Sequence, residues 1–136
     1  MKKPQTGNRK SNNMKPQDFF TRQRSNEGER MYIIDPLTGI KSNEYLIVRG
    51  FDSDEFNAAL VDKRRENARI LSLPQEEQKE ASEAAELVLI ASTVGGWSFD
   101  ADYTLEALLE LLREAPSVCT EIDKFSSNRA NFINPR

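Results

Sequence analysis

The chain has 136 residues, of which 30% are charged and 38% hydrophobic, and its mean hydropathy is −0.66, which suits one soluble domain with a modest core. It contains one cysteine, Cys119, and no histidine, which excludes an internal disulfide, cysteine-based zinc sites and a histidine base. No apolar run approaches the roughly 20 residues of a membrane helix, and the basic N-terminus lacks the apolar segment of a secretory signal.

Charge is distributed unevenly along the chain. Residues 1–30 carry a net charge of +5, whereas the remaining residues carry −8. A basic arm on an acidic body can contact nucleic acid. We expect a solvated tail instead, because no pattern of Lys or Arg with aromatic residues precedes Phe19 and the acidic body would repel phosphate. We therefore do not expect nucleic acid as a partner.

Residues 1–17 are expected to form a disordered basic arm. Methionine is the only apolar residue type in the first 16 positions, so this stretch cannot offset the entropy of ordering. A single α-rich domain is then expected over residues 18–136. Phe19 and Phe20 lie near its start in a polar setting, where they either dock on the body or anchor a partner.

Residues 31–49 predict a β-hairpin. The runs 31–34 and 45–48 are rich in β-branched and aromatic residues, and the DPLTG segment between them is typical of a turn in which Gly39 takes a positive φ. Both runs are continuously apolar, so both faces of the ribbon are expected to need cover. Because a ribbon edge can pair with a second copy, self-association is a hypothesis for this hairpin. Its candidate residues are Tyr32, Ile34, Tyr45 and Ile47.

Two helices are predicted after the hairpin. Asp52 and Glu55 form a possible capping box that starts the first, which runs to about Leu71. Pro74 suits the first turn of the second helix, which continues to Val94 and ends before two glycines. The second half of this helix is apolar nearly all round, so we expect it to form the centre of the core.

Two further helices are predicted in the C-terminal part. Thr104 is expected to cap a short helix over residues 105–114, which carries a broad leucine stripe. Pro116 breaks the chain before a last helix that runs from about Ser117 to Phe132. The predicted fold is therefore mainly α, in the α+β class, with about four helices and a small N-terminal β-hairpin.

No arrangement of residues predicts an enzyme. The carboxylates of Glu106 and Glu110 lie one helical turn apart, which is typical of a solvated helix face. Asp100 and Asp102 lack the glycine and bidentate glutamate of a calcium loop, and Cys119 has no histidine to activate it. We expect no catalytic residue, metal or cofactor. A hydrolase that uses carboxylates alone is the enzymatic alternative.

The sequence supplies more apolar surface than four short helices must bury, which favours an interaction protein. The aromatic pair Trp97 and Phe99, the leucine stripe and the two-sided hairpin contribute this surface. Helix-in-groove binding would suit a helical partner, although each of these side chains taken alone is more often part of a core than of an interface. The candidate partner-binding residues are Trp97, Phe99, Leu108, Leu111 and Phe125.

Three segments within residues 31–133 carry a family resemblance: DPLTG, EYLIVRGFDSDEF and WSFDADYTLEALLELLREAPSVCTEIDKFSSNRANF. They resemble the tail assembly chaperones of long, non-contractile-tailed bacteriophages. The shared pattern is a Trp-x-Phe-Asp motif, a Thr-capped helix with paired leucines and a Pro-initiated helix. It is matched by Trp97, Phe99, Asp100, Thr104, Leu108, Leu111, Leu112, Pro116, Ile122, Phe125, Arg129 and Phe132.

The resemblance implies a function in phage tail morphogenesis. Proteins of this family bind the tape measure protein, keep it soluble and help recruit tail tube subunits around it. They act in the cytoplasm of the infected bacterial host and are absent from the mature virion. This chain would be the shorter product of a frameshifted gene. The alternatives are a small nucleic-acid-binding regulator that uses the basic arm and a structural subunit of the virion.

Overall fold

The computed structural model describes residues 13–134, so most of the expected basic arm over residues 1–17 lies outside the described residues. The fold is α+β, as predicted, but the described residues form five α-helices and three strands rather than four helices and a hairpin. The elements in chain order are η2 (Pro16–Phe19), α1 (Arg22–Glu27), β1 (Glu29–Ile34), β2 (Lys41–Val48), α2 (Asp54–Leu71), α3 (Gln75–Ala91), β3 (Val94–Trp97), α4 (Leu105–Glu114), α5 (Pro116–Ser127) and η3 (Arg129–Phe132).

The predicted hairpin is present and gains a third strand. The sheet order is β1-β2-β3, with both pairs antiparallel. Tyr32 lies opposite Tyr45 in the first pair, and Leu46 lies opposite Trp97 in the second. The prediction that the second helix continues to Val94 is wrong, since α3 ends at Ala91 and residues 94–97 form β3. Pairing with β2 gives this segment hydrogen-bond partners, and that tertiary contact overrides the weak strand propensity of two glycines.

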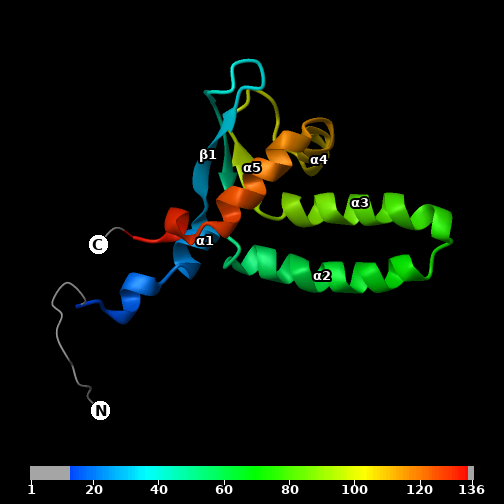
Figure 1. Ribbon diagram of the computed structural model, residues 1–136, viewed down its shortest axis with the longest axis horizontal. Helices are drawn as coiled ribbons and strands as arrows, with labels where there is room; N and C mark the ends of the chain where they lie inside the picture. The colour runs from blue at the N-terminus through cyan, green and yellow to red at the C-terminus, as the bar shows by residue number, and fades with distance from the viewer. Residues whose placement is uncertain (1–12, 135–136) are drawn as a thin grey trace, which may run out of the picture.

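Only one face of the sheet is covered by helices. Leu46 and Val48 are fully buried on the inner face, which packs against α3, α4 and α5 (Figure 1). Tyr32 and Ile34 point the other way and are exposed. The described residues of one chain therefore do not supply the cover that the sequence predicts for this face. The buried core cluster comprises Met31, Leu46, Val48, Ala91, Val94, Leu108, Leu112, Val118 and Ile122.

The first long helix begins with a different cap from the one predicted. The Ser53 Oγ accepts a hydrogen bond from the Phe56 amide at 3.2 Å, so Ser53 is the N-cap of α2. Asp52 does not cap the helix, because its carboxylate accepts hydrogen bonds from Arg129 and Thr21. A longer-range ion pair has therefore replaced the local cap that the sequence predicts.

The two C-terminal helices, α4 and α5, begin where the sequence predicts. The Thr104 hydroxyl accepts a hydrogen bond from the Ala107 amide at 3.1 Å, which confirms the predicted cap of α4. Pro116 is the first residue of α5. The predicted end at Phe132 is wrong, since α5 ends at Ser127 and η3 follows. This break turns the chain so that Phe132 is fully buried.

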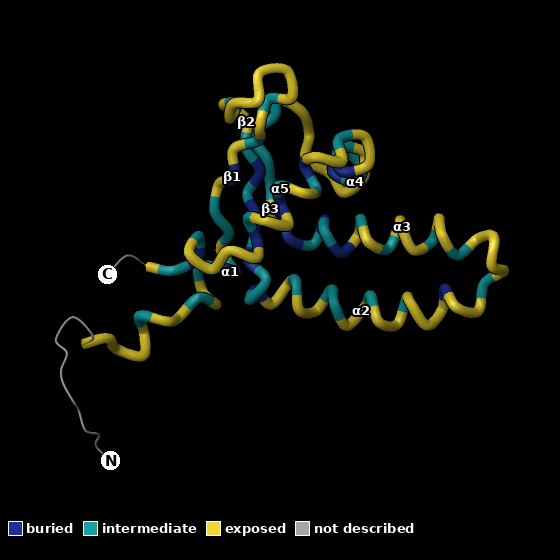
Figure 2. The backbone as a smooth tube through the Cα atoms, viewed as in Figure 1, coloured by how far each residue is buried: buried dark blue, intermediate teal, exposed yellow. Residues whose placement is uncertain are grey.

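Helices α2 and α3 form a long antiparallel hairpin that extends away from the sheet (Figure 1). An ion pair between Lys63 and Glu86 joins the two helices, and at the tip the Gln78 side chain donates to the Leu73 carbonyl oxygen at 3.0 Å. Ile70 is the one residue of α2 that is buried. Most of the hairpin is exposed or half-buried (Figure 2), so it contributes little to the core.

The second half of α3 does not form the centre of the core, contrary to the prediction. Leu89 and Ala91 are buried, whereas Val88 is 53% exposed. The sheet, α4 and α5 supply most of the buried cluster instead, because the inner sheet face and the leucine stripe of α4 pack together. No helix in the described residues 13–134 combines the length and apolar character needed to cross a membrane.

Candidate functional site

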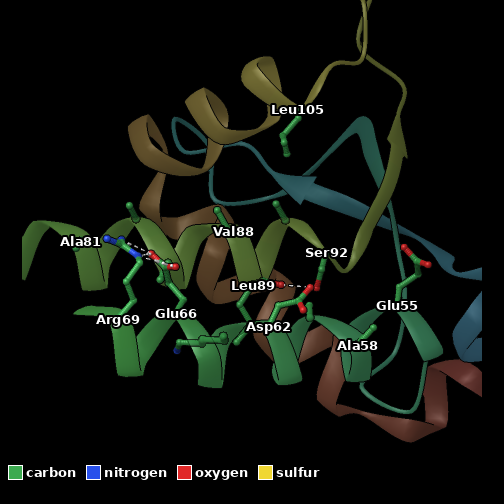
Figure 3. Close-up of a pocket in the computed structure, with 15 residues that line it drawn as sticks. Glu55, Ala58, Asp62, Glu66, Arg69, Ala81, Val88, Leu89, Ser92 and Leu105 are labelled. Atoms are coloured by element: carbon green, nitrogen blue, oxygen red, sulfur yellow. Dashed lines mark hydrogen bonds and ion pairs between the residues drawn. The ribbon is translucent and has the colours of Figure 1, made fainter. Parts of the chain in front are cut away.

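An open groove with a volume of about 690 Å³ lies between α2 and α3, with the start of α4 at one end. We call it the α2–α3 groove. One wall comes from each helix, and Leu105 of α4 projects toward α3 at the end nearest the sheet (Figure 3). Leu105 is 57% exposed. The groove is therefore an accessible surface of the body and of the extended hairpin together.

The α3 wall of the groove is uncharged and built mainly from small side chains. Its residues recur at spacings of three and four positions, so they form one stripe along the helix. Val88 is the largest side chain in the exposed part of this stripe. Small side chains allow an approaching helix to come close, toward the lower end of the interaxial range of about 8–10 Å. The stripe consists of Ala81, Ala84, Ala85, Val88 and Ser92.

The α2 wall carries both apolar and charged side chains. Ala58 and Ala59 continue the apolar floor, while Glu55, Asp62 and Glu66 bring carboxylates to the rim. These positions also recur at helical spacing, so α2 presents them on one face. The two walls therefore differ in chemistry: the α3 wall is uncharged, and the α2 wall carries Lys63 and Arg69 as well as the three carboxylates (Figure 3).

Part of the charge on the α2 wall is neutralised within the helix. The Arg69 guanidinium donates two hydrogen bonds from its Nε to the Glu66 carboxylate at 3.1 Å. This contact holds the pKa of Glu66 below its usual value, and it raises the pKa of Arg69. The Asp62 Oδ1 lies 3.5 Å from the Arg65 Nη1, but both side chains are largely exposed. Ion pairs exposed in this way contribute little to stability.

The groove has the properties of a binding surface for apolar side chains. Its α2 wall runs from Glu55 to Arg69, a length of about 21 Å. Exposed apolar surface is unfavourable in water at about 25 cal/mol per Å², and a partner that covers it recovers that free energy. An amphipathic helix fits this shape, because its apolar stripe would meet the floor while its polar side faces solvent.

The five sequence-predicted partner residues lie elsewhere. Leu108 is buried in the core, and Trp97, Phe99, Leu111 and Phe125 are half-buried against it. None of the five lines the α2–α3 groove. The structure brings Trp97 and Phe99 together, with ring centroids 5.3 Å apart in an edge-to-face arrangement.

The aromatic cluster around Trp97 is held by hydrogen bonds within the chain. The Trp97 Nε1 donates to the Ala101 carbonyl oxygen at 2.9 Å. The Tyr103 hydroxyl donates to the Val94 carbonyl oxygen at 2.9 Å, and its ring packs edge-to-face on Trp97. Burial raises the pKa of Tyr103. These contacts connect β3 to the loop before α4, so the cluster stabilises that loop.

The four candidate self-association residues share the uncovered face of the sheet. Tyr32 and Tyr45 lie opposite each other in register, with ring centroids 5.4 Å apart. The Arg30 guanidinium lies 4.4 Å from the centre of the Tyr45 ring, and Ile47 lies opposite Arg30. Ile34 is exposed at the end of β1, where its amide donates to Glu121 at 3.0 Å.

The groove residues were missed by sequence reasoning. The sequence pattern that could have revealed them is the recurrence of alanine at helical spacing in two consecutive helices, at positions 58, 59, 81, 84 and 85. Small residues on one helix face do not identify a groove by themselves, because the partner helix decides whether they are covered. Here small residues of both helices line an open groove.

Within the part of the chain that the structure describes, no group of three or more acidic or cysteine side chains could hold a metal ion. No protein-family model, curated protein or solved structure matches this chain.

Proposed function

We propose that this protein is a tail assembly chaperone of a long-tailed bacteriophage, and that it binds an amphipathic helix of the tape measure protein in the α2–α3 groove. The observation that carries the proposal is the accessible groove, with an apolar floor that runs along two exposed helices. The likeness of residues 31–133 to tail assembly chaperones supports the choice of client.

The expected affinity suits a chaperone that must release its client. Each large apolar side chain of the client contributes about 1.5–3 kcal/mol when fully buried. Three or four such side chains in an open groove are offset by the free-energy cost of association, about 4–15 kcal/mol. The net result is a reversible complex, which keeps the client soluble until tail tube subunits replace the chaperone.

The proposal places the protein in the cytoplasm of the infected bacterial host and outside the mature virion. Its partners are the tape measure protein and the tail tube protein. We also propose a homo-oligomer formed through β1, because β1 is an edge strand of the described sheet and a free edge is a template for a second copy. Exposed Tyr32 and Ile34 on the uncovered face of β1 would lie at this interface.

The first experiment is co-expression with the tape measure protein. We expect the client to be more soluble in the presence of this protein and to co-purify with it. Ala58→Arg places a long charged side chain in the groove and is expected to abolish both effects. Ala68→Arg is the matched control, because Ala68 lies on the same helix, is exposed and does not line the groove.

Three results would contradict the proposal. If the client is equally soluble without this protein, or if Ala58→Arg and Ala68→Arg retain the client equally, the groove is not the client site. If mass spectrometry finds this protein in purified virions in stoichiometric amounts, the chain is a structural subunit. As a folding control, circular dichroism should show the same helical content in both variants as in the parent.

A further inference from the structure

The chemistry of the groove also specifies the charge of its client, an inference that rests on the proposed function. We infer that the bound helix carries basic side chains along one flank of its apolar stripe, and that two of them pair with Glu55 and Asp62. The partner is therefore an amphipathic helix with a lysine- or arginine-bearing flank, and its opposite flank is uncharged.

The first argument is the asymmetry of the two walls. The α3 wall has no charged side chain, whereas the α2 wall carries three carboxylates and two basic side chains, Lys63 and Arg69. A helix seated between the walls has one flank against each. The flank beside α3 contacts alanine and valine, and the flank beside α2 lies next to acidic side chains. Complementary charge on that flank is favoured and like charge is disfavoured.

The second argument concerns which carboxylates are engaged within the chain. Glu66 is paired with Arg69, and Lys63 is paired with Glu86 of α3. Both basic residues of the groove are thus committed to acidic partners. Glu55 and Asp62 contribute the remaining negative charge, and the contact of Asp62 with Arg65 is long and solvent-exposed.

The spacing of these two carboxylates sets the spacing of the client charges. Glu55 and Asp62 are seven residues apart, which is about two turns or 10.5 Å along the helix. Basic side chains at positions i and i+7 of the client have the same separation. Because Glu55 and Asp62 are exposed, each pair is a rim ion pair that salt screens.

The same charges argue against a second copy of this chain as the occupant. A second α2–α3 hairpin would present the same acidic wall and the same uncharged wall. Its groove-facing cations, Lys63 and Arg69, are already paired with Glu86 and Glu66. A self-complex through the groove would therefore bring acidic side chains together without new cations, whereas a basic helix supplies them.

The test uses three labelled peptides that differ only in their flank. Each peptide is an amphipathic helix of about 18 residues whose apolar stripe consists of leucines spaced three and four residues apart. On one flank of this stripe, two further positions seven residues apart are both Lys, both Gln or both Glu. Fluorescence anisotropy measures the dissociation constant of each with the full chain, at low salt and at high salt. We expect the Lys peptide to bind about fivefold to tenfold more tightly than the Gln peptide, which corresponds to two rim ion pairs of about 0.5–0.7 kcal/mol each. The Glu peptide should bind most weakly, and high salt should reduce the differences.

A pair of double variants assigns the effect to the groove. Glu55→Lys with Asp62→Lys is expected to reverse the preference, so that the Glu peptide binds most tightly. Glu76→Lys with Glu83→Lys is the matched control. It changes the same number of charges at the second and ninth positions of α3, which correspond to those of Glu55 and Asp62 in α2, and it lies outside the groove. This control is expected to keep the parent's order of affinities.

The outcomes separate the two proposals. If none of the peptides binds, the groove is not a helix site and the proposed function fails. If all three peptides bind equally, helix binding stands and the inference of a basic flank is overturned. The inference is also overturned if the two double variants show the same order of peptide affinities. A protein that sediments as a dimer, and as a monomer after Ala58→Arg, would assign the groove to a second copy. If the lysine variant does not fold, Glu55→Gln with Asp62→Asn is expected to abolish the preference for the Lys peptide.

Discussion

Arg129 and Asp52 are separated by 77 positions and form a two-point ion pair. The Arg129 Nε lies 2.7 Å from the Asp52 Oδ2, and the Nη2 lies 2.9 Å from the Oδ1. The Thr21 hydroxyl also donates to the Asp52 Oδ2, at 2.6 Å. One carboxylate therefore connects η3, the start of α2 and the residue before α1.

This connection predicts a pH-dependent contribution to stability. The hydrogen bond from Arg129, followed by that from Thr21, lowers the pKa of the Asp52 carboxyl in the folded protein. The unfolded state binds the proton more readily, so the stabilisation is present above the unfolded pKa of about 4 and is lost as the pH falls through the folded pKa. We expect Asp52→Asn to lower the free energy of unfolding by about 1 kcal/mol at pH 7.

Urea denaturation of both proteins at pH 7 and near pH 2.5 checks this prediction. The difference between parent and variant should shrink at the lower pH. Asp123→Asn is the control, because Asp123 is exposed on α5 and such substitutions are usually within about 0.5 kcal/mol. A difference that persists unchanged at low pH would show that ionisation of Asp52 is not its cause.

Gly50 is expected to tolerate no larger side chain. A Cβ at this position would lie 2.9 Å from the Phe132 Cδ2 and closer still to the Ser25 hydroxyl. Gly50→Ala should therefore destabilise the protein by about 1–3 kcal/mol through overpacking. Gly96→Ala is the control, since the nearest atom to its Cβ would be 3.9 Å away on Ile47. Equal midpoints of urea unfolding for the two variants would contradict the close packing at Gly50.

The C-terminal 3₁₀ turn is expected to be essential for stability. Phe132 is fully buried and packs edge-to-face on Phe125 at 5.7 Å. Phe132→Ala should lower the free energy of unfolding by about 3–5 kcal/mol, because it leaves a cavity. Phe19→Ala removes the same atoms from a side chain that is 64% exposed and should change stability by about 0.5 kcal/mol or less. Thermal unfolding followed by circular dichroism compares them, and similar losses from both would refute the prediction.

The proposed homo-oligomer is tested on the uncovered sheet face. Tyr32→Lys introduces a charge on the exposed side of β1 and should lower the fraction of dimer at a given concentration, because burying an unpaired charge is costly. Leu71→Lys places the same charge on an exposed apolar side chain at the far end of α2 and should leave the fraction unchanged. Sedimentation velocity measures both. A parent protein that is monomeric at all concentrations would rule out this oligomer.

Local sequence features predicted the elements that depend on neighbouring residues. The capping hydroxyl of Thr104 and the proline at position 116 mark the starts of α4 and α5, because capping and a fixed φ act within one turn of the chain. The hairpin turn, with Gly39 at a φ of +75°, was predicted for the same reason. Asp52 was assigned to a cap because its partner Arg129 is distant in sequence.

Tertiary structure alone decided the rest. Residues 94–97 become a strand because β2 lies beside them, although their two glycines favour a turn. The candidate site depends in the same way on two helices that lie side by side in an antiparallel hairpin and line an open groove with their alanines. By itself the sequence determined the α+β class, the hairpin and the placement of apolar stripes, since these follow from local propensity and periodicity. Which stripes are buried and which form a groove depends on how distant segments pack, and only the folded chain specifies that.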